Sequence, residues 1–257
     1  MGRRWTENEN KFIKEHFGSL TYQEIGNLIE RTKSSVMNQA RKLGLTSKGL
    51  GKNPLSTRRK YKINDSIFNE INNTNAYLAG FIAADGCISG NKVRIGLQIG
   101  DIKYLQKIKD LFSYDGKIYL YSSACSLEMT SEEIVMDLKE KFNIVERKSL
   151  TLKPPILEER NHILSFIKGY IDGDGSIYYT NNRGYKYLTL SVIGTEAMCS
   201  FIKKEFEDIL VAETPKLQQR ANVYHYRING KQAEKVYKFL KHEVKTPALE
   251  RKWKKEL

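Results

Sequence analysis

The sequence predicts an α+β fold of two similar halves, preceded by a small all-α domain of three helices. An apolar helical segment that ends in Asp-Gly occurs twice, at residues 77–86 and 166–175. Each copy opens the same predicted order of elements, αββαββα, which indicates an internal duplication. The first 46 residues show only helix N-cap signals and helical apolar spacing.

The two copies, YLAGFIAADG and FIKGYIDGDG, carry small residues four positions apart. These are Gly80 and Ala84 in the first copy, and Gly169 and Gly173 in the second. Because small residues at this spacing give a helix a smooth stripe, we expect the two helices to pack closely against each other. Each helix is expected to stop at a glycine in the left-handed conformation, Gly86 or Gly175.

An acid closes each helix, Asp85 in the first copy and Asp174 in the second. A carboxylate in the last turn meets the negative end of the helix dipole, and two neighbouring carboxylates repel each other. A hard divalent cation bound between them would remove both penalties, so the pattern predicts a metal site. The alternative is two unrelated buried helices with ordinary Asp-Gly ends, and the second copy argues against it.

These segments resemble the signature of the LAGLIDADG homing endonucleases, in their single-chain form with two motifs, over roughly residues 65–257. The resemblance implies a monomeric endonuclease whose antiparallel sheets bind double-stranded DNA at a long target site. It implies cleavage of both strands across the minor groove, with short 3′ overhangs, in the homing of an intron. It also implies that Asp85 and Asp174 hold two or more Mg²⁺ ions, for which Mn²⁺ can substitute.

Three further residues match family positions that order water or assist the reaction: Asp101, Thr195 and Lys231. The first half has Thr130 and Ser131 at the place of Lys231, so the two catalytic centres are expected to be unequal. Asp101 could instead cap its helix, and Lys231 could be ordinary surface charge.

The copies also differ at an earlier acid, which is Asp172 in the second copy and Ala83 in the first. The family does not generally use this acid to hold metal. Lys168 stands where an apolar residue is usual, and its spacing predicts an ion pair with Asp172.

Residues 1–46 are expected to form helices over 6–17, 21–29 and 32–43, the second with a capping box between Thr21 and Glu24. The pattern W-T-x-x-E … E-I-G … R-T-x-S-S-V resembles Myb/SANT-like helix-turn-helix domains, in which the third helix enters the major groove. Its outward residues here would be Lys33, Ser34, Met37, Asn38 and Arg41. The alternative is a module that binds protein.

The predicted organisation is a helix-turn-helix domain over 1–46, a basic linker over 47–64, a first half over 65–156 and a second half over 157–257. The linker either follows DNA phosphates or is merely solvated. Ile99 and Leu120 are expected to point inward from their strands, and of the last strand either Tyr224 and Tyr226 or, preferably, His225 and Arg227 face outward. Candidate DNA contacts in the linker and sheets are Arg58, Arg59, Lys60, Lys92, Arg94, Gln98, Lys117, Tyr119, Arg183, His225 and Arg227.

Charge and composition favour a nucleic-acid partner. The 257 residues have a net charge of +13, and residues 1–60 hold 13 Lys and Arg against 5 Asp and Glu. Three scattered cysteines argue against a zinc site or a disulfide framework. Neither a membrane-spanning run nor a signal peptide is evident, so a soluble intracellular protein without membrane contact is expected.

The main rival function is an intron-splicing maturase or a non-catalytic DNA-binding regulator on the same scaffold. Many such regulators lack the metal-binding acids, which this sequence retains, although maturases can retain them too. A purely structural or protein-interaction role fits poorly with the basic charge and the paired acids.

Overall fold

The computed structural model describes residues 4–17, 19–45 and 60–255, which belong to two compact units, residues 1–61 and 62–257. Of the three proposed linker contacts, Arg58 and Arg59 lie outside the described residues, and Lys60 is described. None of the helices in the described part of the chain is long and apolar enough to cross a membrane.

The first unit contains three helices, α1 (Glu7–His16), α2 (Tyr22–Leu28) and α3 (Lys33–Lys42). Each begins at a threonine whose side chain accepts a backbone N–H bond, and the predicted capping box of α2 is present. A small core of fully buried side chains joins them, formed by Ile13, Ile25, Val36 and Ala40. The three predicted helices are confirmed, and their helix-turn-helix function stays a prediction.

A buried ion pair also holds this unit together. The Arg31 guanidinium binds the Glu9 carboxylate at 3.0 Å and lies 4.4 Å from the ring centre of Trp5. The hydrogen bond from Arg31, followed by that from the Thr6 backbone, lowers the pKa of Glu9 to about 2. Glu9 therefore keeps its charge, and its partner, at physiological pH.

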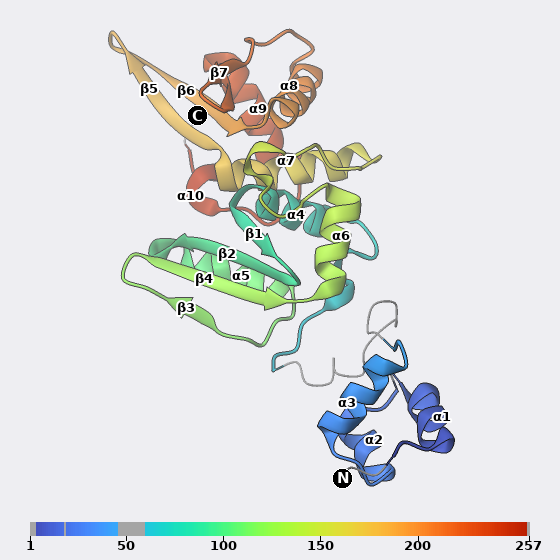
Figure 1. The fold of residues 1–257 in the computed structure, drawn as a ribbon. Coiled ribbons are helices and arrows are strands. Elements are labelled where there is room, and N and C mark those ends of the chain that lie inside the picture. Colours follow the sequence, from blue (N-terminus) through green and yellow to red (C-terminus); the bar gives the residue numbers. More distant parts are fainter. Residues whose placement is uncertain (1–3, 18, 46–59, 256–257) are drawn as a thin grey trace. The chain divides into compact units, whose positions relative to one another are not determined.

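The second unit repeats one order of elements, which Figure 1 shows as two halves. The first half contains α4 (Asn73–Asp85), β1 (Gly86–Ser89), β2 (Lys92–Gln98), α5 (Ile102–Leu111), β3 (Ile118–Leu120), β4 (Ala124–Thr130) and α6 (Glu132–Phe142). The second contains α7 (Arg160–Asp174), β5 (Ser176–Asn182), β6 (Tyr185–Gly194), α8 (Glu196–Leu210), β7 (Gln218–Arg220), β8 (Val223–Asn229) and α9 (Gly230–His242). Shorter elements are the 3₁₀ turns η2 (Asp65–Phe68), η3 (Ile99–Asp101) and η4 (Lys148–Leu150), and helix α10 (Glu250–Trp253). The predicted fold class is confirmed.

Each half has one four-stranded antiparallel sheet, ordered β1-β2-β4-β3 and β5-β6-β8-β7. Strand β2 alternates between exposed and buried side chains, because one face packs on helices α5 and α6 and the other is open. The open face therefore presents the polar side chains of Lys92, Arg94 and Gln98, with Gly96 between the last two.

Two inward placements predicted from the sequence are wrong, those of Ile99 and Leu120. Strand β2 ends at Gln98 and the chain turns into η3, which leaves Ile99 37% exposed. Leu120 is 62% exposed because β3 is a three-residue edge strand, paired with β4 alone.

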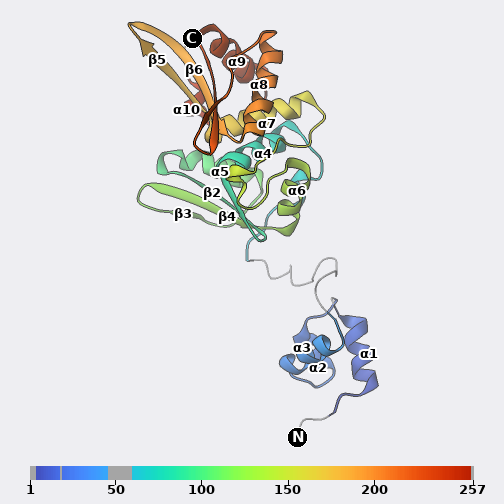
Figure 2. The same cartoon turned by 45° about the horizontal axis from the view of Figure 1, so that its top comes forward.

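Helices α4 and α7 lie side by side between the two halves in both views (Figures 1 and 2). A Cβ added at Gly169 would lie 2.0 Å from the carbonyl oxygen of Tyr77, and one at Gly173 would lie 2.3 Å from the Cβ of Ala84. The predicted close packing through small residues is confirmed.

The expected left-handed conformation of Gly86 and Gly175 is wrong. Both are extended, with φ of −81° and −84°. They are needed for space instead, since a Cβ at either position would lie 2.6 Å from the carbonyl oxygen of Ile82 or Ile171.

Candidate active site at the junction of the two halves

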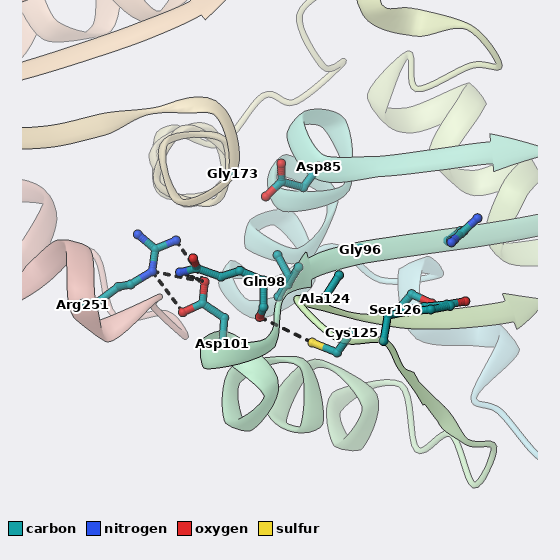
Figure 3. Close-up of a pocket in the computed structure, with 12 residues that line it drawn as sticks. Asp85, Gly96, Gln98, Asp101, Ala124, Cys125, Ser126, Gly173 and Arg251 are labelled. Carbon is teal, nitrogen blue, oxygen red and sulfur yellow. Dashed lines mark hydrogen bonds and ion pairs between the residues drawn. The ribbon is translucent and has the colours of Figure 1, made fainter.

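The acids Asp85 and Asp174 meet at one end of the packed helix pair, because each is the last residue of its helix. A Cβ at Gly173 would lie 3.4 Å from the Cγ of Asp85, so the carboxyl group of Asp85 sits against the end of α7. Figure 3 shows it above the strand that carries Gly96 and Gln98. The duplicated motif thus places one acid from each half at the junction.

The environment of the helix ends raises the pKa of both carboxyl groups. The protein atoms packed around the helix end, and then the charge of Asp174, raise the pKa of Asp85 to about 6. Burial likewise raises the pKa of Asp174. Both carboxyl groups therefore resist ionisation, and a cation bound beside them would favour their charged forms.

Two lysines bind the carbonyl oxygens at the ends of these helices. The Nζ of Lys148 donates to the carbonyl oxygen of Ala84 at 3.1 Å. The Nζ of Lys252 donates to four carbonyl oxygens, those of Ile171 (2.9 Å), Asp172 (2.6 Å), Gly173 (2.9 Å) and Gly175 (2.7 Å). The last carbonyls of a helix commonly lack an intrahelical partner, although that of Ile171 also accepts the N–H of Gly175. A cation there opposes the negative end of the dipole. Burial lowers the pKa of Lys252 to about 8, and also lowers that of Lys148.

Asp101 lies in the same region and forms a two-point ion pair with Arg251. The Nε of Arg251 is 3.0 Å from one carboxylate oxygen of Asp101, and its Nη2 is 2.9 Å from the other. The Nε2 of Gln98 lies 3.0 Å from this second oxygen. Although burial alone would raise the pKa of Asp101, these bonds lower it. These side chains and Asp85 line an open pocket of about 500 Å³ (Figure 3).

No protein-family model matches the chain, and no curated protein matches it by sequence. Solved structures do match. I-GzeII, a LAGLIDADG homing endonuclease crystallised in complex with its DNA target, is similar with a TM-score of 0.52 at 15% identity, over 70% of this chain and 86% of that chain. The fold is that of the LAGLIDADG homing endonucleases. The LAGLIDADG meganuclease I-AabMI, bound to uncleaved DNA, has a TM-score of 0.49 at 19% identity over 72% of this chain and 87% of its own.

Lys148, Lys252 and Arg251 were missed in the sequence although a signal for them exists. Each lysine ends a Glu-Arg-Lys tripeptide, at residues 146–148 and 250–252. These tripeptides follow the last helix of each half of the LAGLIDADG fold, so they are a second internal repeat. The sequence instead pointed to Lys231, which is exposed on the first turn of α9.

The positions of Asp101 and Thr195 in the two halves differ chemically. The proposed capping role of Asp101 is wrong, because its side chain makes no cap hydrogen bond to α5. Thr195 does cap its helix, since its hydroxyl accepts the N–H of Met198 at 3.2 Å and donates to the carbonyl oxygen of Leu152 at 2.7 Å. The Asp101 carboxylate is thus held in an ion pair and the Thr195 hydroxyl in a helix cap. The role of each residue in ordering water stays a prediction.

The candidate DNA contacts lie mostly on open surfaces of the LAGLIDADG sheets. Lys92, Arg94 and Gln98 share the exposed face of β2, while Lys117 and Tyr119 are exposed at β3. On β8 Tyr226 is fully buried and Arg227 is exposed, as the preferred outward pair requires, while His225 and Tyr224 are both half-buried. Arg183 is in the turn between β5 and β6. The remaining exposed candidates are Lys33, Ser34, Asn38 and Arg41 on α3, and Lys60.

The described residues contain no group of three or more His, Cys, Asp or Glu side chains able to hold a metal ion. The pair Asp85 and Asp174 is nevertheless a suitable donor set for Mg²⁺. This ion keeps several waters and is commonly bound through one or two carboxylates together with substrate phosphates.

Proposed function

We propose that the chain is a site-specific, Mg²⁺-dependent DNA endonuclease of the homing type, which cuts both strands of a long duplex target across the minor groove. The observation that carries this proposal is the pair Asp85 and Asp174 at the ends of two packed helices, one from each half. With one acid from each half, the site would act on both strands of a duplex.

Asp85 and Asp174 are the residues that would hold the metal. When bound, Mg²⁺ supplies positive charge for the phosphate and lowers the pKa of the attacking water. Lys148 and Lys252 place positive charge at the helix ends that carry the two acids. This charge offsets the negative ends of the helix dipoles and so favours the approach of a phosphodiester. Asp101 and Thr195 are the proposed water-ordering residues, and they leave the two centres unequal.

DNA binding is proposed for the open faces of the two sheets and for helix α3. Lys92, Arg94 and Lys117 supply positive charge on the first sheet, and Arg183 and Arg227 on the second. Phosphate contacts of this kind supply most of the affinity, while Gln98, Tyr119 and His225 can reach base edges. I-GzeII, which has the same fold, was crystallised with its DNA target.

The test is cleavage of a plasmid that carries the candidate insertion site, first with Mg²⁺ and then with EDTA. We expect a double-strand cut in Mg²⁺ only. Asp85→Asn and Asp174→Asn should each abolish it while leaving specific binding largely intact, because binding rests on the sheets. Asp110→Asn, a change of the same kind at an exposed position of α5, is the matched control and should cut normally.

Wild-type cleavage by either site variant at equal Mg²⁺ would exclude these acids as metal ligands. Specific binding without cleavage under every metal tested would instead favour the alternative function of a non-catalytic DNA-binding regulator. Rescue of intron splicing by the protein would favour the maturase function.

A further inference from the structure

The buried acid Asp172 is not used by the proposed chemistry, although it lies in the motif helix two residues before Asp174. Its side chain is 1% exposed and accepts three hydrogen bonds. The donors are the hydroxyl of Tyr77 (2.6 Å), the backbone N–H of Leu249 (2.7 Å) and the indole N–H of Trp253 (2.6 Å). Two of these three donors belong to the segment of residues 244–253.

The same segment is bound by the lysine one turn earlier in α7. The Nζ of Lys168 donates to the carbonyl oxygen of Val244 at 2.7 Å and lies 5.3 Å from the ring centre of Trp253. Instead of forming the predicted ion pair with each other, Lys168 and Asp172 each bind the segment of residues 244–253 separately. Trp253 also stacks on Tyr237 of α9 with ring centres 5.4 Å apart.

Residues 250–252 of this segment reach the junction of the two halves. Lys252 binds the carbonyl oxygens that end α7, and Arg251 binds Asp101 in the first half. Glu250 pairs with Lys107 of α5, also in the first half, at 2.8 Å. The segment thus carries one basic group to the acids and two ionic contacts across the molecule.

We propose that Asp172 is a positioning residue, which fixes the 244–253 segment on α7 so that Lys252 is held at the end of this helix and Arg251 at Asp101. This inference rests on the proposed function, because it assigns a task to the residues around that site. The carboxylate acts through Leu249 and Trp253, which flank the two basic residues on either side in the chain.

Among the described residues, this use of a buried acid in the motif helix occurs in the second half alone. The first copy of the motif has Ala83 at this position, and Lys148 there makes one carbonyl bond where Lys252 makes four. The segment holds Arg251 at Asp101, whereas the counterpart Thr195 bonds to Leu152 and Met198. Loss of Asp172 should therefore affect the centre beside Asp101 more than the other centre. A general loss of stability would slow both strands alike.

The test compares Asp172→Asn with wild type in single-turnover cleavage, with each strand end-labelled. The asparagine keeps the size of the side chain but turns one acceptor into a donor that faces other donors. We expect one strand to slow by about 10-fold or more, since small misplacements of site groups have large effects, while the other strand changes less than about 3-fold. Amide hydrogen exchange in residues 244–255 should become faster, and binding in EDTA should be retained.

Trp253→Phe and Tyr77→Phe are compared because each removes one hydrogen-bond donor to the same carboxylate, and Tyr77→Phe also removes a hydroxyl bonded to that of Tyr104. Trp253 belongs to the 244–253 segment and Tyr77 to α4. Trp253→Phe should reproduce the strand-selective loss, and Tyr77→Phe should leave the ratio of the two rates unchanged.

An unchanged ratio in Asp172→Asn, with unchanged exchange in residues 244–255, would overturn the proposal. So would equal effects of Trp253→Phe and Tyr77→Phe on that ratio. Absence of any cleavage by the wild-type protein would contradict the proposed function instead, and hydrogen exchange would then still decide whether Asp172 fixes the segment.

Discussion

The carbonyl oxygen of Phe166 occupies the place where a side chain at Gly80 would begin, since a Cβ at Gly80 would lie 1.9 Å from that oxygen. The same contact occurs in reverse between Gly169 and the carbonyl oxygen of Tyr77, at 2.0 Å. Phe166 stands three positions before Gly169 in α7, and Tyr77 stands three positions before Gly80 in α4. The internal repeat thus makes a helix interface that is symmetric in its backbone contacts.

Gly80→Ala and Gly169→Ala should each destabilise the protein, by about 1–3 kcal/mol or more, because the added methyl group meets backbone that cannot rotate away. The loss is measured by urea unfolding of each variant. Gly96→Ala is the control: its Cβ would meet nothing within 4 Å, so it should change stability little. A loss for Gly80→Ala no greater than that of Gly96→Ala would contradict the close approach.

The sequence predicted those features that local pattern alone determines. The apolar spacing and N-cap signals located nearly every helix, and the doubled Asp-Gly ending located both acids. Leu120 was misplaced because alternation cannot show that an edge strand lacks a covering helix.

The basic residues of the site could not be found in the same way. A lysine in a Glu-Arg-Lys tripeptide is normally solvated, and only the folded chain shows that Lys252 is buried on four carbonyl oxygens. The partner of Asp101 lies 150 residues away in sequence, at Arg251, so no local pattern links them. Gly86 and Gly175 were expected for their backbone conformation but are required for space.

The stability of the metal-free protein should depend on the charge of Asp85. Its pKa of about 6 lies above the ordinary value of 3.8, so its ionised form destabilises the folded state above pH 6 and this penalty fades as the pH falls towards 4. Asp85→Asn should therefore have a higher Tm than wild type at about pH 8 in EDTA, with a difference that shrinks towards about pH 4.

Thermal unfolding of both proteins across this pH range, with EDTA and with Mg²⁺, is the measurement. Mg²⁺ should raise the Tm of the wild type more than that of Asp85→Asn, because a ligand that binds the native state stabilises it. A Tm difference that stays constant with pH would contradict the raised pKa of Asp85.

The two DNA strands should be cut at different rates. Asp101 holds an ion pair with Arg251, whereas its counterpart Thr195 is a helix cap whose hydroxyl proton is donated to Leu152. Unequal surroundings of the attacking water give unequal rates, so a nicked intermediate should accumulate. Time courses on a supercoiled plasmid measure it, and equal rates without an open-circle form would contradict these roles.

The last prediction concerns the first unit, whose α3 exposes Lys33, Ser34, Asn38 and Arg41. If this unit binds DNA beside the cleavage site, its contact is intramolecular, with an effective concentration on the order of millimolar. A weak module with a Kd of ~10⁻⁴–10⁻⁶ M would then tighten binding by roughly 10- to 1,000-fold, which corresponds to about 1.4–4 kcal/mol.

Deletion of residues 1–61 should weaken binding and flatten its salt dependence, while cleavage at high protein concentration continues. The cut follows residue 61 because the backbone N–H groups of Lys62 and Asn64 bond to Asp115 and Phe112 of the second unit. The DNA footprint should shorten at one end only, since the described part of the chain contains one such unit. Lys33→Ala with Arg41→Ala in the full chain is the control that keeps the unit but removes its charge, and it should reproduce much of the loss. An unchanged footprint and affinity after deletion would exclude DNA binding by this unit and favour its alternative role, the binding of another protein.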